Sequence, residues 1–251
     1  MPQLFKPYAN VIAKTSLLLG LATPVLLGLA LAAVSRSPAN TRVYDPLNQP
    51  IPFSHQHHVQ ELGIDCRYCH TSVETSAYAG VPATEVCMSC HSQIWTNSPL
   101  LEPVRQSYET GTPIQWVRVN NTPEFVNFNH SIHVARGVSC NNCHGAVQEM
   151  QITWKGRAFQ MQWCLDCHRA PERYLFIDKE KPDQTPRQRV FDLYWKLQEH
   201  GTKGLTPREQ ALAKGGEQIS NKAEDITEGK RLVEAYGVKV QQLADCGVCH
   251  Y

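Results

Sequence analysis

Ten cysteines and five of the eleven histidines of this 251-residue chain fall into one repeated pattern, Cys-x-x-Cys-His. Cysteines at i and i+3 lie on one side of a helical turn. This pattern is the attachment motif of c-type haem: both thiols form thioethers to the porphyrin, and the histidine ligates the iron. We number the five copies in chain order as site 1 (Cys66, Cys69, His70), site 2 (Cys87, Cys90, His91), site 3 (Cys140, Cys143, His144), site 4 (Cys164, Cys167, His168) and site 5 (Cys246, Cys249, His250).

Two other uses of paired cysteines explain this pattern less well. Zinc sites also use Cys-x-x-Cys pairs, and an oxidising compartment can join cysteines as disulfides. Neither use requires a histidine directly after the second cysteine, whereas all five pairs have one and no cysteine is left over. We therefore expect five covalent haem c groups and no disulfides. The porphyrins would form much of the apolar core, so that haem loss unfolds the domain.

An internal repeat supplies candidate second ligands for four irons. The pattern Phe-x-His-x-x-His occurs at residues 53–58 and 128–133, and two Cys-x-x-Cys-His motifs follow each copy. A low-spin electron-transfer haem needs a second axial ligand. Histidines at i and i+3 of a helix share a face but lie one turn apart, so they suit two irons better than one. The four histidines that recur in both copies are His55, His58, His130 and His133.

Site 5 lies outside the repeat and has no such histidine pair. We expect its second ligand to be Met150 or Met161, which would raise its potential above that of a bis-His haem. His200 is the fallback, although a histidine at the end of a helix ordinarily compensates the helix dipole. His57 has no counterpart in the second copy and is expected to be an exposed polar residue.

The N-terminal part contains one candidate membrane span. Residues 16–34 are 19 positions without a charge, and at about 1.5 Å per residue they nearly match a bilayer core of about 30 Å. We expect an uncleaved anchor over residues 16–35, preceded by a cytoplasmic tail over residues 1–15. A cleaved signal peptide is the competing interpretation, because residues 30–32 read Ala-Leu-Ala, like a cleavage site.

Charge does not decide the orientation of this span, because two lysines precede it and two arginines follow it. Haem is attached to such motifs outside the bacterial cytoplasmic membrane, so residues 36–251 are expected on the periplasmic side. The whole chain has 24 basic and 23 acidic residues, a net charge of +1. This balance leaves no strongly basic surface for nucleic acid.

The rest of the sequence predicts a mainly helical and irregular fold with little sheet. We expect a short strand at residues 114–119 and helices at about 187–200, 207–214 and 227–236. The predicted organisation beyond the anchor is dihaem module 1 at 36–110, dihaem module 2 at 111–178, and a helical spacer with the fifth haem at 179–251.

The chain resembles the pentahaem, membrane-anchored cytochrome c subunits of alternative complex III, a bacterial quinol:electron-acceptor oxidoreductase. The resemblance covers nearly the whole chain: the anchor, both repeat copies, and residues 113–119, 143–145, 161–169 and 245–250. The order Phe-x-His-x-x-His before Cys-x-x-Cys-His is also similar to the small c3 and c7 cytochromes. That similarity implies that His55 and His130 ligate the haems of sites 1 and 3, and that His58 and His133 serve sites 2 and 4.

The resemblance also implies a function and a set of partners. Quinol would be oxidised in integral membrane subunits, an iron–sulfur subunit would lie alongside, and electrons would pass to a monohaem cytochrome subunit or a soluble carrier. This chain would then be a membrane-bound electron-transfer subunit, in contact with lipid, and no enzyme by itself. The alternatives are a multihaem quinol dehydrogenase feeding a periplasmic reductase, a catalytic multihaem reductase with an open haem, and a soluble periplasmic electron store.

Overall fold

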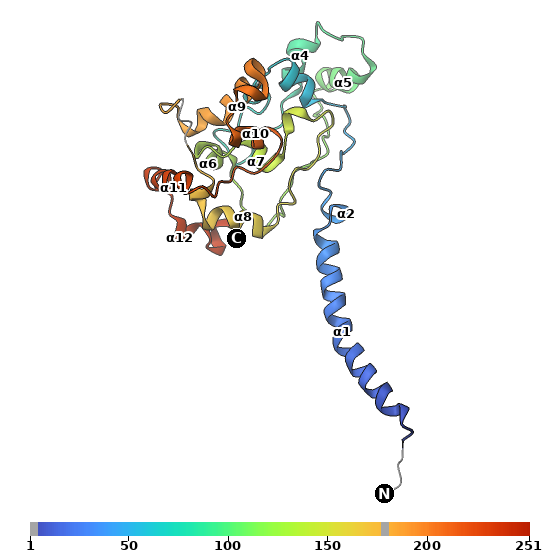
Figure 1. The fold of residues 1–251 in the computed structure, drawn as a ribbon. Helices are drawn as coiled ribbons and strands as arrows, with labels where there is room; N and C mark the ends of the chain where they lie inside the picture. The colour runs from blue at the N-terminus through green and yellow to red at the C-terminus, as the bar shows by residue number, and fades with distance from the viewer. Residues whose placement is uncertain (1–4, 177–180) are drawn as a thin grey trace. The chain divides into compact units, whose positions relative to one another are not determined.

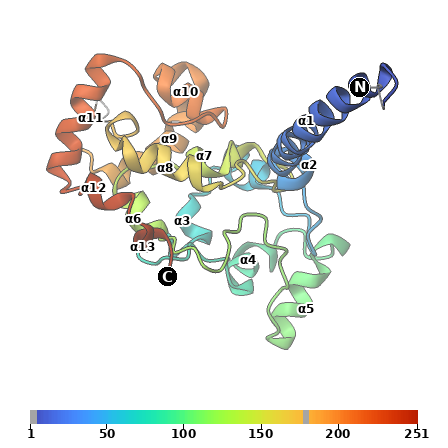
Figure 2. The same cartoon turned by 90° about the horizontal axis from the view of Figure 1, so that it is seen from below.

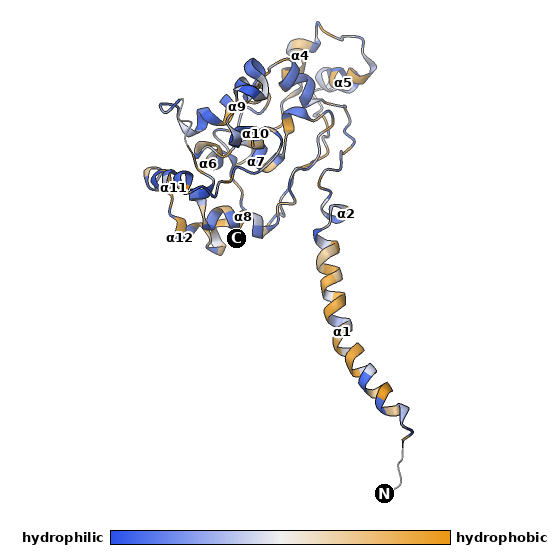
Figure 3. Cartoon of the chain, in the orientation of Figure 1, coloured by the Kyte–Doolittle hydropathy of each residue, from blue (hydrophilic) through white to orange (hydrophobic). Residues whose placement is uncertain are grey.

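The computed structural model describes residues 5–176 and 181–251, and the chain divides into two compact units, Met1–Val43 and Tyr44–Tyr251. The first unit contains α1 (Tyr8–Arg36) and the single turn α2 (Pro38–Thr41). Helix α1 has no buried residue, and apolar side chains run along most of its length (Figure 3). Its 29 residues, with a mean hydropathy of 2.4 over an 18-residue window, are long and apolar enough to cross a bilayer. It is therefore a candidate membrane anchor.

The second unit, Tyr44–Tyr251, consists of short helical segments joined by irregular loops (Figures 1 and 2). Most segments span only one to three turns. In chain order they are η1 (Gln56–Glu61, a π-helix), α3 (Cys66–Cys69), α4 (Thr84–His91), η2 (Pro99–Leu101), α5 (Glu102–Thr110), α6 (His130–Ala135), α7 (Cys140–His144), η3 (Val147–Glu149), α8 (Met161–Arg169), η4 (Pro171–Arg173), α9 (Pro186–His200), η5 (Gly201–Gly204), α10 (Pro207–Ala213), α11 (Ala223–Ala235), α12 (Val240–Leu243) and α13 (Cys246–Cys249).

Among the described residues, strand pairing is limited to isolated bridge residues, including the antiparallel bridges of Pro46 with Trp154 and of Val126 with His250. The mainly helical and irregular fold class is therefore confirmed. The strand expected at 114–119 is wrong. The side-chain amide of Gln49 bonds both the N–H and the carbonyl of Val117, each at 2.9 Å, and so takes the place of a neighbouring strand.

The helices expected near the C-terminus are present. α9 and α10 lie within one residue of their predicted bounds, and each begins with a capping box, in which the Thr185 and Thr206 side chains accept backbone N–H groups. α11 begins at Ala223, earlier than expected, with Glu224 and Asp225 in its first turn. Acidic side chains there favour a helix start, because the N-terminus carries the positive end of the helix dipole.

Helix α9 packs against both copies of the repeat. Its Val190 and Phe191 form a buried cluster with Val73, which follows site 1, and with Val134 of α6. Its Leu193 belongs to a second buried cluster, together with Leu212 and Ala213 of α10 and with Leu205, which precedes α10. The two small cores of the unit thus meet along α9.

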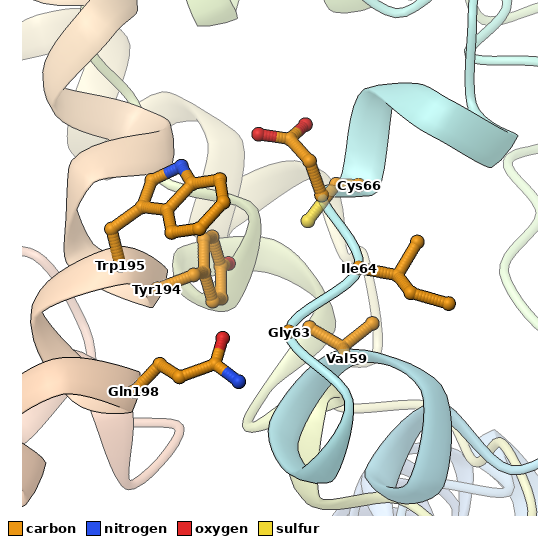
Figure 4. Close-up of a pocket in the computed structure, with 8 residues that line it drawn as sticks. Val59, Gly63, Ile64, Cys66, Tyr194, Trp195 and Gln198 are labelled. Carbon is orange, nitrogen blue, oxygen red and sulfur yellow. The ribbon is translucent and has the colours of Figure 1, made fainter.

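Two glycines at equivalent positions of the repeat allow this close packing. Gly63 and Gly137 stand three residues before the first cysteine of sites 1 and 3, and both have a left-handed backbone, with φ of 69° and 79°. A Cβ at Gly63 would lie 2.0 Å from Oε1 of Gln198, and one at Gly137 would lie 3.2 Å from Cβ of Pro186. Only glycine combines this φ with so little space. Figure 4 shows the small pocket beside Gly63, with the side chain of Gln198 pointing toward that glycine.

The predicted division of residues 36–251 into two modules and a spacer stays a prediction. Residues 44–251 form one compact unit. The expected boundary between residues 178 and 179 lies outside the described residues.

Candidate haem sites

Each Cys-x-x-Cys-His motif forms a helical turn that places its two cysteines on one side. Sites 2 and 4 lie in α4 and α8, and sites 1, 3 and 5 form α3, α7 and α13. The carboxylate of Asp65 caps α3 by accepting the backbone N–H of Arg67 at 2.8 Å. None of the ten cysteines forms a disulfide in the described part of the chain. Burial raises the pKa of Cys143 and of Cys167 to about 12, so these thiols stay protonated at neutral pH.

Four pairs of histidine rings face each other across gaps of nearly equal width. Two imidazoles on opposite sides of one metal ion have ring centres about 6 Å apart, because each metal–nitrogen bond is about 2 Å long. Every predicted distal histidine is paired with the histidine of the site expected for it. The centroid separations are 6.5 Å for His55 and His70, 6.2 Å for His58 and His91, 6.3 Å for His130 and His144, and 6.2 Å for His133 and His168.

The relative orientation of the paired rings singles out site 2. The ring planes are nearly parallel at sites 1, 3 and 4, with interplanar angles of 10°, 4° and 19°. At site 2 the planes of His58 and His91 cross at 62°. Site 2 therefore differs from the other three sites in the relative orientation of its two rings.

Backbone carbonyls orient seven of the histidines. A carbonyl oxygen only accepts hydrogen bonds, so each bonded Nδ1 carries the proton and leaves the lone pair of Nε2 free for a metal. The sequence pattern contains no sign of these partners, since any residue type supplies a carbonyl. The Nδ1 to oxygen distances are 2.9 Å from His58 to Ser54, 2.6 Å from His70 to Gly80, 3.2 Å from His91 to Ile94, 2.8 Å from His130 to Ala77, 2.7 Å from His133 to Asn129, 3.0 Å from His168 to Leu243 and 3.3 Å from His250 to Phe125.

Burial keeps two further imidazoles of the sites neutral. It lowers the pKa of His55 and of His144 to about 4 in each case, and the neighbouring histidines add to the effect. A neutral imidazole is the form that binds metal. The hydroxyl oxygen of Thr153 lies 3.2 Å from Nδ1 of His55 and can accept a hydrogen bond from it.

The phenylalanine of each repeat copy holds both histidines of that copy. Phe53 lies edge-on to His55, with centroids 5.0 Å apart, and stacks on His58 at 4.5 Å. Phe128 repeats this geometry, with 4.8 Å to His130 and 4.7 Å to His133. The sequence showed the phenylalanine as part of the repeat, but only the structure shows that it orients the two rings.

Site 5 has no histidine partner in ring contact among the described residues. Its His250 lies beside the ring of Phe125, with centroids 5.7 Å apart. Met150 is only 2% exposed, and its carbonyl accepts the backbone N–H of Gln56, next to site 1. Met161 is 63% exposed at the start of α8, and α8 packs against α12, which leads into site 5.

The two remaining histidines lie elsewhere. His57 is exposed, and its Nδ1 bonds the carboxylate of Glu61 at 2.8 Å. His200 is exposed at the end of α9, beside Gly204. Within the described parts of the chain, no group of three or more His, Cys, Asp or Glu side chains gathers in a way that would hold a metal ion.

Comparison with protein families supports the haem interpretation for the second repeat copy. Residues 126–187 match the family described as cytochrome c7 and related cytochrome c. This segment is similar to multihaem cytochromes c. It contains the histidine pair of α6 together with sites 3 and 4. The match to this family favours covalently attached haem c, and the paired histidines and paired thiols of sites 1 to 4 fit that cofactor.

One curated relative extends the comparison. Over 127 residues the chain is 35% identical to "Menaquinone reductase, multiheme cytochrome c subunit" of Nitratidesulfovibrio vulgaris. The match covers 50% of this chain and 60% of the relative. The chain therefore spans less than two thirds of the length of the curated relative that it matches.

Proposed function

We propose that this chain carries five haem c groups and serves as an electron-transfer subunit of a membrane quinone oxidoreductase. When bound, haem supplies reversible one-electron chemistry at iron. The observation that carries the proposal is the set of four histidine pairs 6.2 to 6.5 Å apart. Such a pair would hold an iron with two protein ligands, which would leave no ligand position for a substrate. A relay fits this arrangement better than a catalytic reductase.

The polypeptide contributes ligand geometry and burial. Carbonyl oxygens fix the protonation of the ligand histidines, and Phe53 and Phe128 hold their rings. A preset ligand orientation reduces structural rearrangement when the charge of the metal changes. Under this proposal, the chain neither makes nor breaks a bond in a substrate.

The proposed second ligand at site 5 is Met161. It lies on the same face of α8 as Cys164, three residues away, and it is exposed, whereas Met150 is enclosed beside η1. Burial, aided by the nearby Cys249 thiol of site 5, raises the pKa of Cys164. Met161 thus begins the helix that approaches site 5.

A redox titration of the holoprotein tests this ligand. Met161→Leu is expected to lower only the highest of the haem potentials, because methionine raises the potential relative to histidine. The control Met150→Leu should leave all potentials in place. A drop with Met150→Leu alone would assign that residue instead, and no change with either variant would favour His200.

The proposed setting is the one that the resemblance to alternative complex III implies. α1 would be an uncleaved single-pass anchor, with sites 1 to 5 on the periplasmic side. Quinol-oxidising membrane subunits and an iron–sulfur subunit would be the neighbours, and a monohaem cytochrome or a soluble carrier would accept the electrons. The apolar surface of α1, which carries no charged residue over residues 16–34, supports the anchor.

The name of the curated relative favours a second candidate, in which electrons travel toward the quinone. That protein is a menaquinone reductase subunit, and the present chain would by analogy deliver electrons from a periplasmic donor to menaquinone. Paired histidine ligands are compatible with electron flow in either direction, so the chain is an electron-transfer subunit in both candidates.

The deciding experiment adds a quinol to the purified complex and to the purified chain. We expect rapid haem reduction in the complex and none in the isolated chain. Quinol oxidation by the isolated chain would overturn the relay proposal. Menaquinone reduction by the complex with a reduced periplasmic cytochrome, without haem reduction by quinol, would support the second candidate.

A further inference from the structure

We propose that the five sites lie in one spatial series in the order 2, 1, 3, 4, 5, so that the first two sites exchange places relative to the sequence. The inference rests on the proposed haem loading. Site 2 then stands at one end, and site 1 joins the two repeat copies. Each step of the series is carried by contacts between residues of the two sites that it connects.

The contact between sites 2 and 1 is direct. Within the two motifs, the hydroxyl of Tyr68 and that of Ser89 are hydrogen-bonded at 2.8 Å. The second histidines of these sites, His55 and His58, lie one turn apart around η1, and Phe53 contacts both rings.

Site 1 meets site 3 through the loop that follows it. The carbonyl of Gly80 accepts from Nδ1 of His70, and the carbonyl of Ala77 accepts from Nδ1 of His130. One loop therefore orients the proximal histidine of site 1 and the distal histidine of site 3. Cys66 and Cys140 also pack against the same buried cluster of valines and Phe191.

Sites 3 and 4 share α6. His130 at its first position pairs with site 3, and His133, one turn later, pairs with site 4. This is the same relation that η1 gives to sites 1 and 2, so the two repeat copies each hold one adjacent pair.

Site 4 meets site 5 through α12. The carbonyl of Leu243, at the end of α12, accepts from Nδ1 of His168 at 3.0 Å. Site 5 begins three residues later. Its Cys249 carbonyl accepts the N–H of Asn127 at 2.7 Å, which places site 5 beside the approach to α6.

The two ends of this series are also the most open sites. Cys90 of site 2 and Cys246 of site 5 are exposed, whereas the other eight cysteines are partly buried. In the described part of the chain, no hydrogen bond or ring contact joins site 2 to the second repeat copy. A series in sequence order would require site 2 to lie between sites 1 and 3.

The test compares His58→Met with the matched variant His133→Met in the haem-loaded full chain, by electron paramagnetic resonance during a redox titration. Methionine raises the potential of the altered haem, which is then reduced and diamagnetic while its neighbours are still oxidised. The electron paramagnetic resonance signals of the adjacent oxidised haems then change, because their magnetic interaction with the altered haem is lost. His58→Met should change the signal of one other haem, because site 2 is terminal. His133→Met should change two, because site 4 is interior.

Two altered signals with His58→Met would overturn the series. If that variant does not incorporate five haems, electron cryo-microscopy of the unaltered chain decides instead. The iron of site 3 should then have the iron of site 1 as a nearest neighbour, and a nearest neighbour at site 2 would refute the order. Fewer than five haems in the unaltered chain, or an iron open to exogenous ligand, would contradict the proposed function and not the spatial order alone.

Discussion

The two repeat copies, residues 53–91 and 128–168, reproduce the same arrangement of phenylalanine and histidine rings but differ in what surrounds it. The first pair of histidines sits on a π-helix, η1, and the second on an α-helix, α6, capped by the side chain of Asn129. The inner residues of site 1, Arg67 and Tyr68, are exposed. Those of site 3 are buried asparagines.

These asparagines connect the second copy to the C-terminal helices. The amide of Asn141 donates to the side chain of Gln148 and to the carbonyl of Leu212, and it accepts the hydroxyl of Tyr194. Asn142 accepts the backbone N–H of Gln218. The repeat thus specifies ligand geometry in both copies, while residues outside the repeat determine how far each copy is buried.

The largest expected difference concerns haem loss. In protein produced without haem attachment, hydrogen exchange should be fast throughout residues 53–70 and slower in α9 and α10, which hold five of the eight buried side chains of the two apolar clusters. Haem binding contributes to the stability of the folded state only, so the less buried copy depends on it more. Equal protection of both regions in the haem-free chain would contradict this difference.

Next in size is the effect of the inner residues of sites 1 and 3. Asn141→Ala removes three side-chain hydrogen bonds, with Gln148, Leu212 and Tyr194, and we expect a loss on the order of 3 kcal/mol in the free energy of unfolding. The matched variant Arg67→Ala removes an exposed ion pair with Asp65 and should cost less than about 1 kcal/mol. Denaturant titrations of the haem-loaded protein measure both, and similar losses would refute the comparison.

A smaller effect tests the ring geometry. Because His58 and His91 cross at 62°, electron paramagnetic resonance should show one bis-histidine haem with a strongly anisotropic signal, distinct from three of ordinary rhombic shape. Phe53→Leu should shift the signals of sites 1 and 2 only. The control Phe128→Leu should shift those of sites 3 and 4 only. Four alike signals would contradict the crossed arrangement.

The smallest effect is expected at His57, the histidine that the second copy lacks. His57→Ile copies Ile132, and it removes an exposed pair with Glu61. We expect stability to change by less than about 0.5 kcal/mol, with five haems and unchanged spectra. Loss of a haem in this variant would give His57 a ligand role.

Much of the site was predictable because haem attachment imposes a local pattern. Cys-x-x-Cys-His is contained in one turn, and the His-x-x-His spacing follows from helix periodicity, so the repeat alone selected the four histidines that the structure pairs with sites 1 to 4. The capping boxes of α9 and α10 were readable for the same reason. The failed strand at 114–119 depended instead on a distant partner, and Gln49 is 68 positions from Val117.

The sequence by itself determined the number and type of attachment motifs, the candidate ligands and the mainly helical fold, because each depends on residues a few positions apart. The tertiary structure alone decided which carbonyls orient the rings, that α9 packs on both Gly63 and Gly137, and that Met161 and Met150 differ so widely in exposure. Those features join segments distant along the chain. No local pattern encodes them, because a backbone carbonyl or a neighbouring glycine is available from any part of the sequence and only packing selects one.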